Sequence, residues 1–109
     1  MALVIDASVT IAWVIDGEAT PYTEGILNRL AHEEALVPPI WRYEIANALL
    51  VSERRGRITL AGAVEAFQRV ADLPITIDEG QSSRTWSEVF TVARTFQLSV
   101  YDASYVDLA

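Results

Sequence analysis

The sequence of 109 residues contains no cysteine, no lysine and a single histidine, His32. Without cysteine, the chain can form neither a disulfide nor a thiolate zinc site. Without lysine, it lacks the G-K-[ST] segment of a P-loop. One histidine cannot build a zinc site by itself, and nothing around His32 supports serine-hydrolase chemistry. These absences leave carboxylate-bound metal as the leading hypothesis for a functional site.

Long apolar runs and an excess of positive charge are also missing. No stretch approaches the roughly 20 apolar residues that cross a bilayer, and no basic segment followed by an apolar one marks a signal peptide. The net charge of −7 argues against binding of nucleic acid through a large basic surface. We therefore expect a single cytoplasmic domain over residues 1–109, without membrane association.

The basic residues are all arginines, and they are unevenly distributed. Arg54, Arg55 and Arg57 cluster, and Arg42 lies two residues before Glu44. Because cations suit the C-terminal end of a helix, a solvated helix end explains the cluster. A role in contacting a substrate or partner stays open beside that explanation.

Short apolar runs alternate with helical periodicity along the chain. The runs predict strands at residues 2–5, 35–37 and 75–77. The segments between and after them predict helices that begin near Ala7, Thr20-Pro21, Ile40, Thr59, Trp86 and Asp102. The second of these helices is expected to turn its apolar residues inward, namely Tyr22, Ile26, Leu27 and Leu30. This order predicts an α/β domain with a short, mostly parallel sheet flanked by helices.

Three acidic residues lie where an unpaired charge is costly. Asp6 ends the first apolar run, Glu44 lies within the apolar face of WRYEIANAL, and Asp102 opens YDASYVDLA. A carboxylate rarely enters an interior unless it is paired or holds a metal. Asp6 follows the first strand, at the edge where open α/β sheets bind ligands, so the fold could gather all three. Asn47, three residues beyond Glu44, is expected on the same side of its helix.

Three carboxylates in one place would need a cation. Two unit charges about 4 Å apart repel by about 4 kcal/mol at an effective dielectric constant of about 20. A cation must therefore neutralise the acids, or some of them must be protonated. Oxygen ligands with room for water suit Mg²⁺ or Mn²⁺. Such a site can activate water and stabilise a phosphate under in-line attack, which predicts phosphodiester hydrolysis.

Each acid also has a structural explanation of its own. Asp6 could cap the helix that follows it. Asp102 fits a capping box with the serine three residues before it. Glu44 lies inside a helix, where capping is not available, and would need a pair with Arg42 or Arg84. Taken one residue at a time, these alternatives stay open.

Three segments taken together carry a resemblance to a known family. They are LVIDASV at the start, PPIWRYEIANAL in the middle and LSVYDASYVDLA at the end. In this order and at these separations, the chain resembles PIN-domain ribonucleases of the VapC toxin type over essentially its whole length. The resemblance implies a PIN-like three-layer α/β fold.

The same resemblance implies roles for particular residues. Asp6, Glu44 and Asp102 match the catalytic acids that bind Mg²⁺ or Mn²⁺, Ser8 matches a hydroxyl-bearing position near the metal, and Asn47 matches the asparagine of the E-x-x-N-A-L segment. The implied activity is cleavage of RNA, often tRNA or rRNA, that arrests translation. The implied partners are a second copy of the chain in a homodimer and a cognate VapB antitoxin, whose basic side chain would enter the acidic groove.

The chain departs from the family pattern at its end. Relatives usually continue into another strand with a fourth acid and a last helix, whereas this sequence stops at Ala109, so a C-terminal truncation is expected. Asp107 does not replace that acid, because five residues along a helix point away from Asp102, and a solvated position is expected for it. The departure keeps a second hypothesis open, namely a catalytically impaired PIN-like module that binds an antitoxin peptide or RNA without cutting.

The aromatic residues bear on the expected homodimer. Trp13, Trp41, Tyr43 and Trp86 exceed what a core of this size obviously needs. Some of them are therefore expected at an interface between chains, and core packing is the alternative for each.

Overall fold

A sheet of three parallel strands lies at the centre of the computed structural model, which describes residues 3–15 and 17–109. The strands are β1 (Leu3–Val4), β2 (Ala35–Val37) and β3 (Ile75–Ile77), in the order β1-β2-β3. Ala35 pairs with Leu3 on one side and with Ile75 on the other. The predicted α/β class and parallel pairing are confirmed. The predicted first strand included Ala2, which lies outside the described residues.

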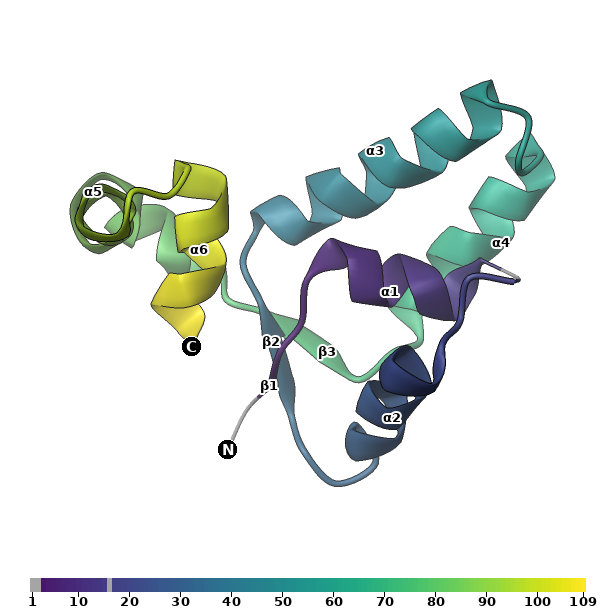
Figure 1. The fold of residues 1–109 in the computed structure, drawn as a ribbon, viewed down its shortest axis with the longest axis horizontal. Helices are drawn as coiled ribbons and strands as arrows, with labels where there is room; N and C mark the ends of the chain where they lie inside the picture. The colour runs from purple at the N-terminus through teal and green to yellow at the C-terminus, as the bar shows by residue number, and fades with distance from the viewer. Residues whose placement is uncertain (1–2, 16) are drawn as a thin grey trace.

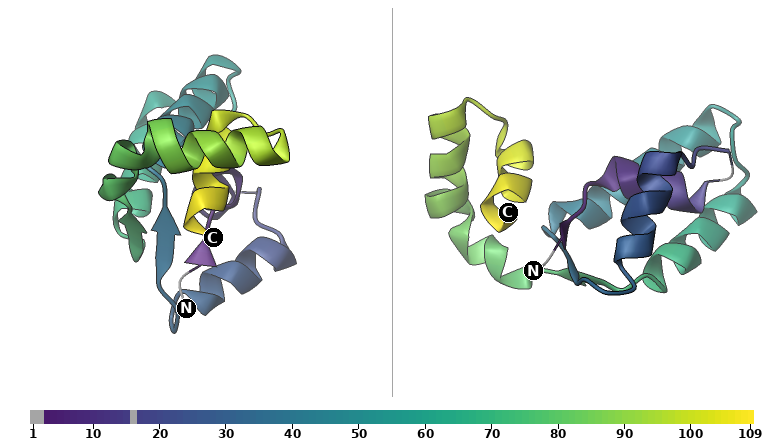
Figure 2. Two further views of the ribbon diagram at one scale, coloured as in Figure 1. Left: turned by 90° about the vertical axis from the view of Figure 1, so that its left-hand side faces the viewer. Right: turned by 60° about the horizontal axis from the view of Figure 1, so that its bottom comes forward.

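Helices make up most of the described chain, and Figure 1 shows how they surround the strands. In chain order they are α1 (Ala7–Val14), α2 (Pro21–Arg29), α3 (Ile40–Arg54), α4 (Leu60–Ala71), the 3₁₀ helix η1 (Glu79–Arg84), the π-helical turn η2 (Thr85–Val89), α5 (Phe90–Phe96) and α6 (Val100–Leu108). The α3–α4 hairpin and the α5–α6 pair lie on opposite sides of the strands (Figures 1 and 2). Over residues 3–15 and 17–109, no helix has both the length and the apolar character needed to cross a membrane.

Local side-chain and backbone signals set the helix ends. The side-chain oxygens of Thr20 and Thr59 each accept a hydrogen bond from the backbone N–H of the residue three positions later, at 3.2 and 3.0 Å. These are the N-caps predicted from the sequence. At the end of α3, the N–H of Arg57 donates to the carbonyl of Ser52 at 2.9 Å. This closing bond requires a left-handed residue, and Gly56 supplies it with φ of +74°.

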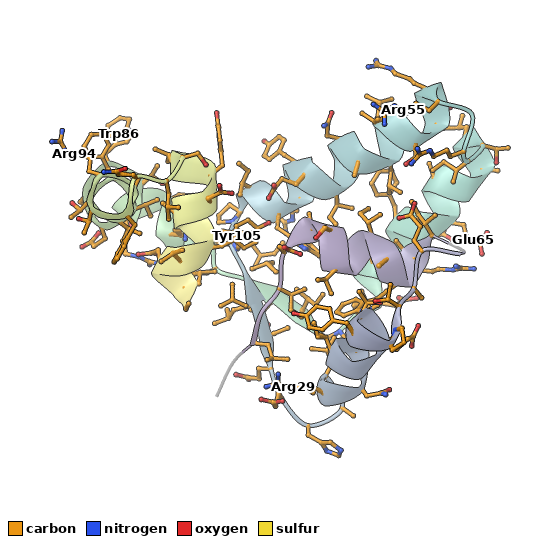
Figure 3. The ribbon with its side chains drawn as sticks, in the orientation of Figure 1. Arg29, Arg55, Glu65, Trp86, Arg94 and Tyr105 are labelled. Carbon is orange, nitrogen blue, oxygen red and sulfur yellow. The ribbon has the colours of Figure 1, made fainter. Side chains whose placement is uncertain are left out.

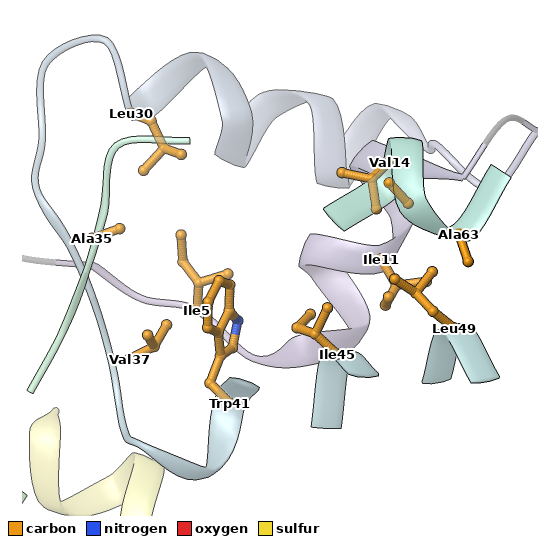
Figure 4. Packing of buried hydrophobic residues seen from close by; sticks show 11 residues of the cluster. Ile5, Ile11, Val14, Leu30, Ala35, Val37, Trp41, Ile45, Leu49 and Ala63 are labelled. Carbon is orange, nitrogen blue, oxygen red and sulfur yellow. The ribbon is translucent and has the colours of Figure 1, made fainter. Parts of the chain in front are cut away.

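The main core lies between the strands and helices α1, α3 and α4. Figure 4 shows Trp41 packed among Ile5, Val37 and Ile45, and each of these side chains is at most 5% exposed. Leu49, one turn further along α3, is completely buried. Burial of one such side chain stabilises the fold by about 1.5–3 kcal/mol. The face of α3 that carries these residues is therefore firmly fixed against the sheet and α1.

The buried face of α2 differs from the one predicted from the sequence. Tyr22 was expected to point inward but is exposed, and Thr23 is the buried side chain of α2. The carbonyl of Thr23 accepts a hydrogen bond from Nε1 of Trp13 at 2.6 Å, which turns that edge of α2 toward α1. In α4 the buried residues are Ala63 and Ala66, whose short side chains allow close approach to the core.

The four aromatic residues considered for an interface fall into two groups. Trp41 belongs to the main core, and Trp13 is half-buried and hydrogen-bonded to α2. In contrast, Tyr43 is 78% exposed and Trp86 is 95% exposed. Core packing therefore explains two of the four, and the other two are free to contact another chain. The homodimer itself stays a prediction.

Candidate functional site

Asp6 lies at the carboxyl end of β1, where α1 begins. Its Oδ1 accepts hydrogen bonds from the backbone N–H of Val9 at 3.0 Å and from the hydroxyl of Ser8 at 2.9 Å. The N-cap explanation considered from the sequence is therefore correct for Asp6. Both bonds use the same oxygen, so Oδ2 has no hydrogen-bond partner within the described chain. Since the residue is exposed, that oxygen can receive a ligand.

A buried chain of hydrogen bonds fixes α3 against this turn. Nε1 of Trp41 donates to the hydroxyl of Thr10 at 3.1 Å, and the Thr10 hydroxyl donates to the backbone oxygen of Asp6 at 3.2 Å. Thr10 is fully buried, so its bond to Trp41 is shielded from water, while its bond to Asp6 is partly buried. Glu44 lies three residues after Trp41, on a neighbouring position of the same helix surface. These hydrogen bonds therefore hold α3, and with it Glu44, close to the end of β1.

The hydroxyl of Tyr105 links α6 to Glu44 on α3, and Figure 3 shows Tyr105 between α6 and the start of α1. It donates a hydrogen bond to Oε1 of Glu44 at 2.5 Å. Burial raises the pKa of Tyr105 above its usual range, as do the hydrogen bond to Glu44 and the charges of Glu44 and Asp6, while the N–H of Ala7 acts in the opposite direction. The phenol is therefore protonated at neutral pH. The phenol is bonded to Glu44, and the negative charge of Asp6 also acts on it.

Neither arginine considered as a partner for Glu44 contacts it. Arg42 pairs with Glu79 at 3.0 Å. Arg84 pairs with two aspartates, at 2.9 and 3.0 Å. Glu44 is thus half-buried with a neutral hydrogen-bond donor, and its negative charge is not cancelled by a cation from the described chain.

Asp107 belongs to a polar network that anchors α6, which corrects the solvated position expected for it. Its Oδ2 accepts hydrogen bonds from Arg84 at 3.0 Å and from Nε2 of Gln81 at 3.1 Å, and its side chain is 10% exposed. Gln81 also donates to the carbonyl of Ser104 at 2.6 Å. The guanidinium of Arg84 further binds Asp78 and lowers the pKa of that carboxyl. The network joins η1 to α6 and so fixes the helix that carries the phenol.

A groove of about 430 Å³ extends from Glu44 between α1 and α3. It is lined by Ala7, Ser8, Ile11, Glu18, Glu44, Asn47 and Ala48. Glu44 and Asn47 line it together, as their spacing on one helix predicts. The hydroxyl of Ser8, the amide of Asn47 and the carboxylates of Glu18 and Glu44 are the polar groups on the walls of this α1–α3 groove.

Asp102 has fewer contacts than the other two acids. It is exposed in the first turn of α6, and its backbone N–H donates to Oγ of Ser99 at 3.0 Å, which is one half of the capping box considered from the sequence. Tyr105 lies three residues later on a neighbouring position of the same helix surface. Over residues 3–15 and 17–109, no three Asp, Glu or His side chains form a group that could hold a metal ion. Within the described residues, Asp6, Glu44 and Asp102 therefore do not form a group of three acids.

The oxygens present fit a hard divalent cation. Mg²⁺ is usually held by one or two carboxylates, and water and substrate phosphates complete its coordination. Oδ2 of Asp6 and Oε2 of Glu44 make no hydrogen bond within the described chain, and Ser8, which is bonded to Asp6, lines the same groove as Glu44. A pair of acids with one hydroxyl is therefore a suitable donor set for Mg²⁺ or Mn²⁺.

Comparison with known proteins adds no assignment to this geometry. No protein-family model matches this chain, and no curated protein matches it. The functional conclusion therefore depends on the residues, on their placement in the fold and on the three segments that carry the PIN-domain resemblance.

Two residues at this site were missed by the sequence analysis. Tyr105 was given no role from the sequence, although its spacing of three from Asp102 places both on neighbouring positions of one helix. Glu18 lines the α1–α3 groove but follows α1 in a turn, where no periodicity indicates its direction. A polar aromatic residue one turn from a candidate acid is the signal that would have found the first of them.

Proposed function

We propose that this protein is a Mg²⁺- or Mn²⁺-dependent endoribonuclease, the toxin of a type II toxin–antitoxin system, which cleaves RNA and so inhibits translation. The observation that carries the proposal is that Glu44, held by the hydroxyl of Tyr105, lines the α1–α3 groove together with Ser8, whose hydroxyl donates to the exposed Asp6. Both acids belong to segments that resemble PIN-domain ribonucleases. An RNA substrate, tRNA or rRNA in the family, makes the cytoplasm the proposed location.

The chain's own residues have distinct proposed roles. Asp6 and Glu44 hold the cation through their free oxygens, and Asp102 is assigned to the same cation by the family resemblance. When bound, the cation supplies positive charge that stabilises a phosphate under attack by water. Ser8, already oriented by Asp6, and Asn47, on the groove wall, contact the RNA strand and position its phosphate.

RNA cleavage is expected to require Mg²⁺ or Mn²⁺. The test is incubation of the full chain with tRNA and rRNA in the presence of each cation or of EDTA, followed by separation of the fragments. Fragments that form only with the cations support the proposal. Equal cleavage in EDTA contradicts it, and RNA binding without cleavage under every condition favours the impaired binding module instead.

Three exposed arginines at the far end of α3 supply positive charge that this acidic protein otherwise has little of. Arg54, Arg55 and Arg57 form no ion pair within the described chain, and Figure 3 shows Arg55 at the opposite end of α3 from Tyr105. Positions 44 and 54 lie on one helix, so they are about 15 Å apart along its axis at a rise of about 1.5 Å per residue. A short RNA strand that leaves the α1–α3 groove along α3 would reach these guanidinium groups.

The variant with Arg54→Gln, Arg55→Gln and Arg57→Gln is expected to bind single-stranded RNA more weakly in EDTA. Its slope of log K against log salt concentration should fall by about 2, because each neutralised phosphate contributes about 0.7. Arg29→Gln is the matched control, since Arg29, the last residue of α2, already pairs with Glu33. An unchanged slope in the triple variant would leave the arginines with a helix-end role only.

A basic antitoxin segment of the VapB type and a second copy of the chain are the proposed partners. The net charge of −7 and the carboxylates of Glu18 and Glu44 in the α1–α3 groove suit a peptide with basic side chains. Tyr43 and Trp86 are among the exposed aromatic residues, and we propose that they contact another protein chain. Measurement of the mass in solution at micromolar concentration tests the homodimer.

A further inference from the structure

We propose that Tyr105 is a positioning residue of the cation site, because its hydroxyl holds the carboxylate of Glu44 at the wall of the α1–α3 groove. The inference rests on the proposed function for its cation. It assigns a role to a residue outside the acid trio, and it predicts a change in cation affinity that can be measured without RNA.

The hydrogen bond of Tyr105 leaves one oxygen of Glu44 available. A phenol carries a single proton, and Tyr105 donates it to Oε1 of Glu44 at 2.5 Å. Oε2 makes no hydrogen bond within the described chain, so it is the oxygen that remains for a cation. Without the phenol, Glu44 would regain rotamer freedom. The hydroxyl therefore keeps the carboxylate of Glu44 in one orientation at the groove before a cation arrives.

The position of the phenol is itself fixed on both sides of Tyr105. Ala103 is completely buried against Val89 and Ala93, which attaches α6 to η2 and α5. On the other side, Asp107 binds Arg84, as described above. Rigid support of this kind is needed for a side chain that orients a metal ligand.

The substitution Tyr105→Phe removes the hydroxyl and keeps the ring. Loss of a group that orients a metal ligand typically lowers metal affinity about 10- to 100-fold. Tyr101→Phe is the matched control, because Tyr101 lies one turn earlier on α6, is 65% exposed and makes no side-chain hydrogen bond within the described chain. The pair separates the effect of this particular hydroxyl from the general loss of a phenol.

The test is calorimetric titration of the full chain with Mn²⁺, in the absence of RNA. We expect the Kd for Mn²⁺ to rise about 10-fold or more in Tyr105→Phe and to stay at the wild-type value in Tyr101→Phe. RNA affinity measured in EDTA should be the same in all three proteins, since a role in folding alone would change it. In the wild type, Mn²⁺ should also broaden the ring signals of Tyr105 more than those of Tyr101 in NMR spectra.

The outcomes separate this inference from the nuclease proposal. Equal Kd values for wild type and Tyr105→Phe, or equal broadening of the two rings, overturn the positioning role and leave the nuclease proposal standing. A wild type that binds Mn²⁺ but cuts no RNA rejects the nuclease, while a 10-fold loss of affinity in Tyr105→Phe would still support the positioning role. A wild type that takes up no Mn²⁺ rejects both.

Discussion

Asp6→Asn is expected to lower the rate of RNA cleavage at least about 100-fold while the fold stays intact. A bound cation contributes several kcal/mol to stabilisation of the transition state, and each 1.4 kcal/mol or so is a factor of about 10 in rate. The substitution is selective because asparagine keeps Oδ1, which accepts the hydrogen bonds of Val9 and Ser8. Asparagine also caps helices as well as aspartate does. The change removes the negative charge and the free oxygen Oδ2.

Two further variants make this experiment specific. Glu44→Gln should cause a similar loss, since glutamine keeps an oxygen that accepts the hydrogen bond of Tyr105 but lacks the charge. Asp72→Asn also removes one negative charge, but Asp72 precedes the amino end of β3, whereas Asp6 follows the carboxyl end of β1. This control substitution should leave the rate unchanged. Cleavage rates and circular dichroism spectra are compared for the three variants and the wild type. Equal cleavage by wild type and Asp6→Asn would reject the assigned site.

Leu49→Ala is expected to lower the free energy of unfolding by about 3 kcal/mol, within the range measured for large-to-small changes in protein cores. Leu49 is completely buried in the main core, so the substitution leaves a cavity between α3 and its neighbours. Leu50→Ala is the matched control, because Leu50 is the next residue on the same helix and is 40% exposed. Its expected cost is below about 1 kcal/mol.

This pair of leucines tests the orientation of α3, on which the candidate site depends. Glu44 reaches the groove only if the buried face of the helix carries Ile45 and Leu49. Urea unfolding followed by tryptophan fluorescence gives both free energies. Equal destabilisation by the two substitutions would mean that α3 is turned about its axis, and Glu44 would then no longer face the α1–α3 groove.

Elements that depend on local sequence were predictable. The strands at 35–37 and 75–77 are short apolar runs bounded by turns, and Thr20 and Thr59 cap helices through bonds to residues three positions away. The buried face of a helix was less predictable, since Tyr22 was expected to point inward and is exposed. Periodicity indicates which side chains share a face, but the neighbouring helix decides which face is buried.

The candidate site divides in the same way. The placement of Asp6 after a strand, and of Glu44 and Asn47 on one side of a helix, follows from short-range geometry and agrees with the structure. The bond between Tyr105 and Glu44 joins residues 61 positions apart, so it depends on how α6 packs. That packing is set by the network around Asp107, whose partners no local pattern indicates. The exposure of Asp102 also depends on how α6 packs, so no local pattern predicts it.

The measurement that tests the central claim most directly is a crystal structure of the full chain with Mn²⁺, in which anomalous scattering locates the ion. We predict one Mn²⁺ bound by Oδ2 of Asp6 and Oε2 of Glu44, at about the 2.1 Å typical of octahedral oxygen sites. Tyr105 should still donate to Oε1. An ion bound elsewhere, or no ion at saturating Mn²⁺, would contradict the assignment of these two acids to a shared cation.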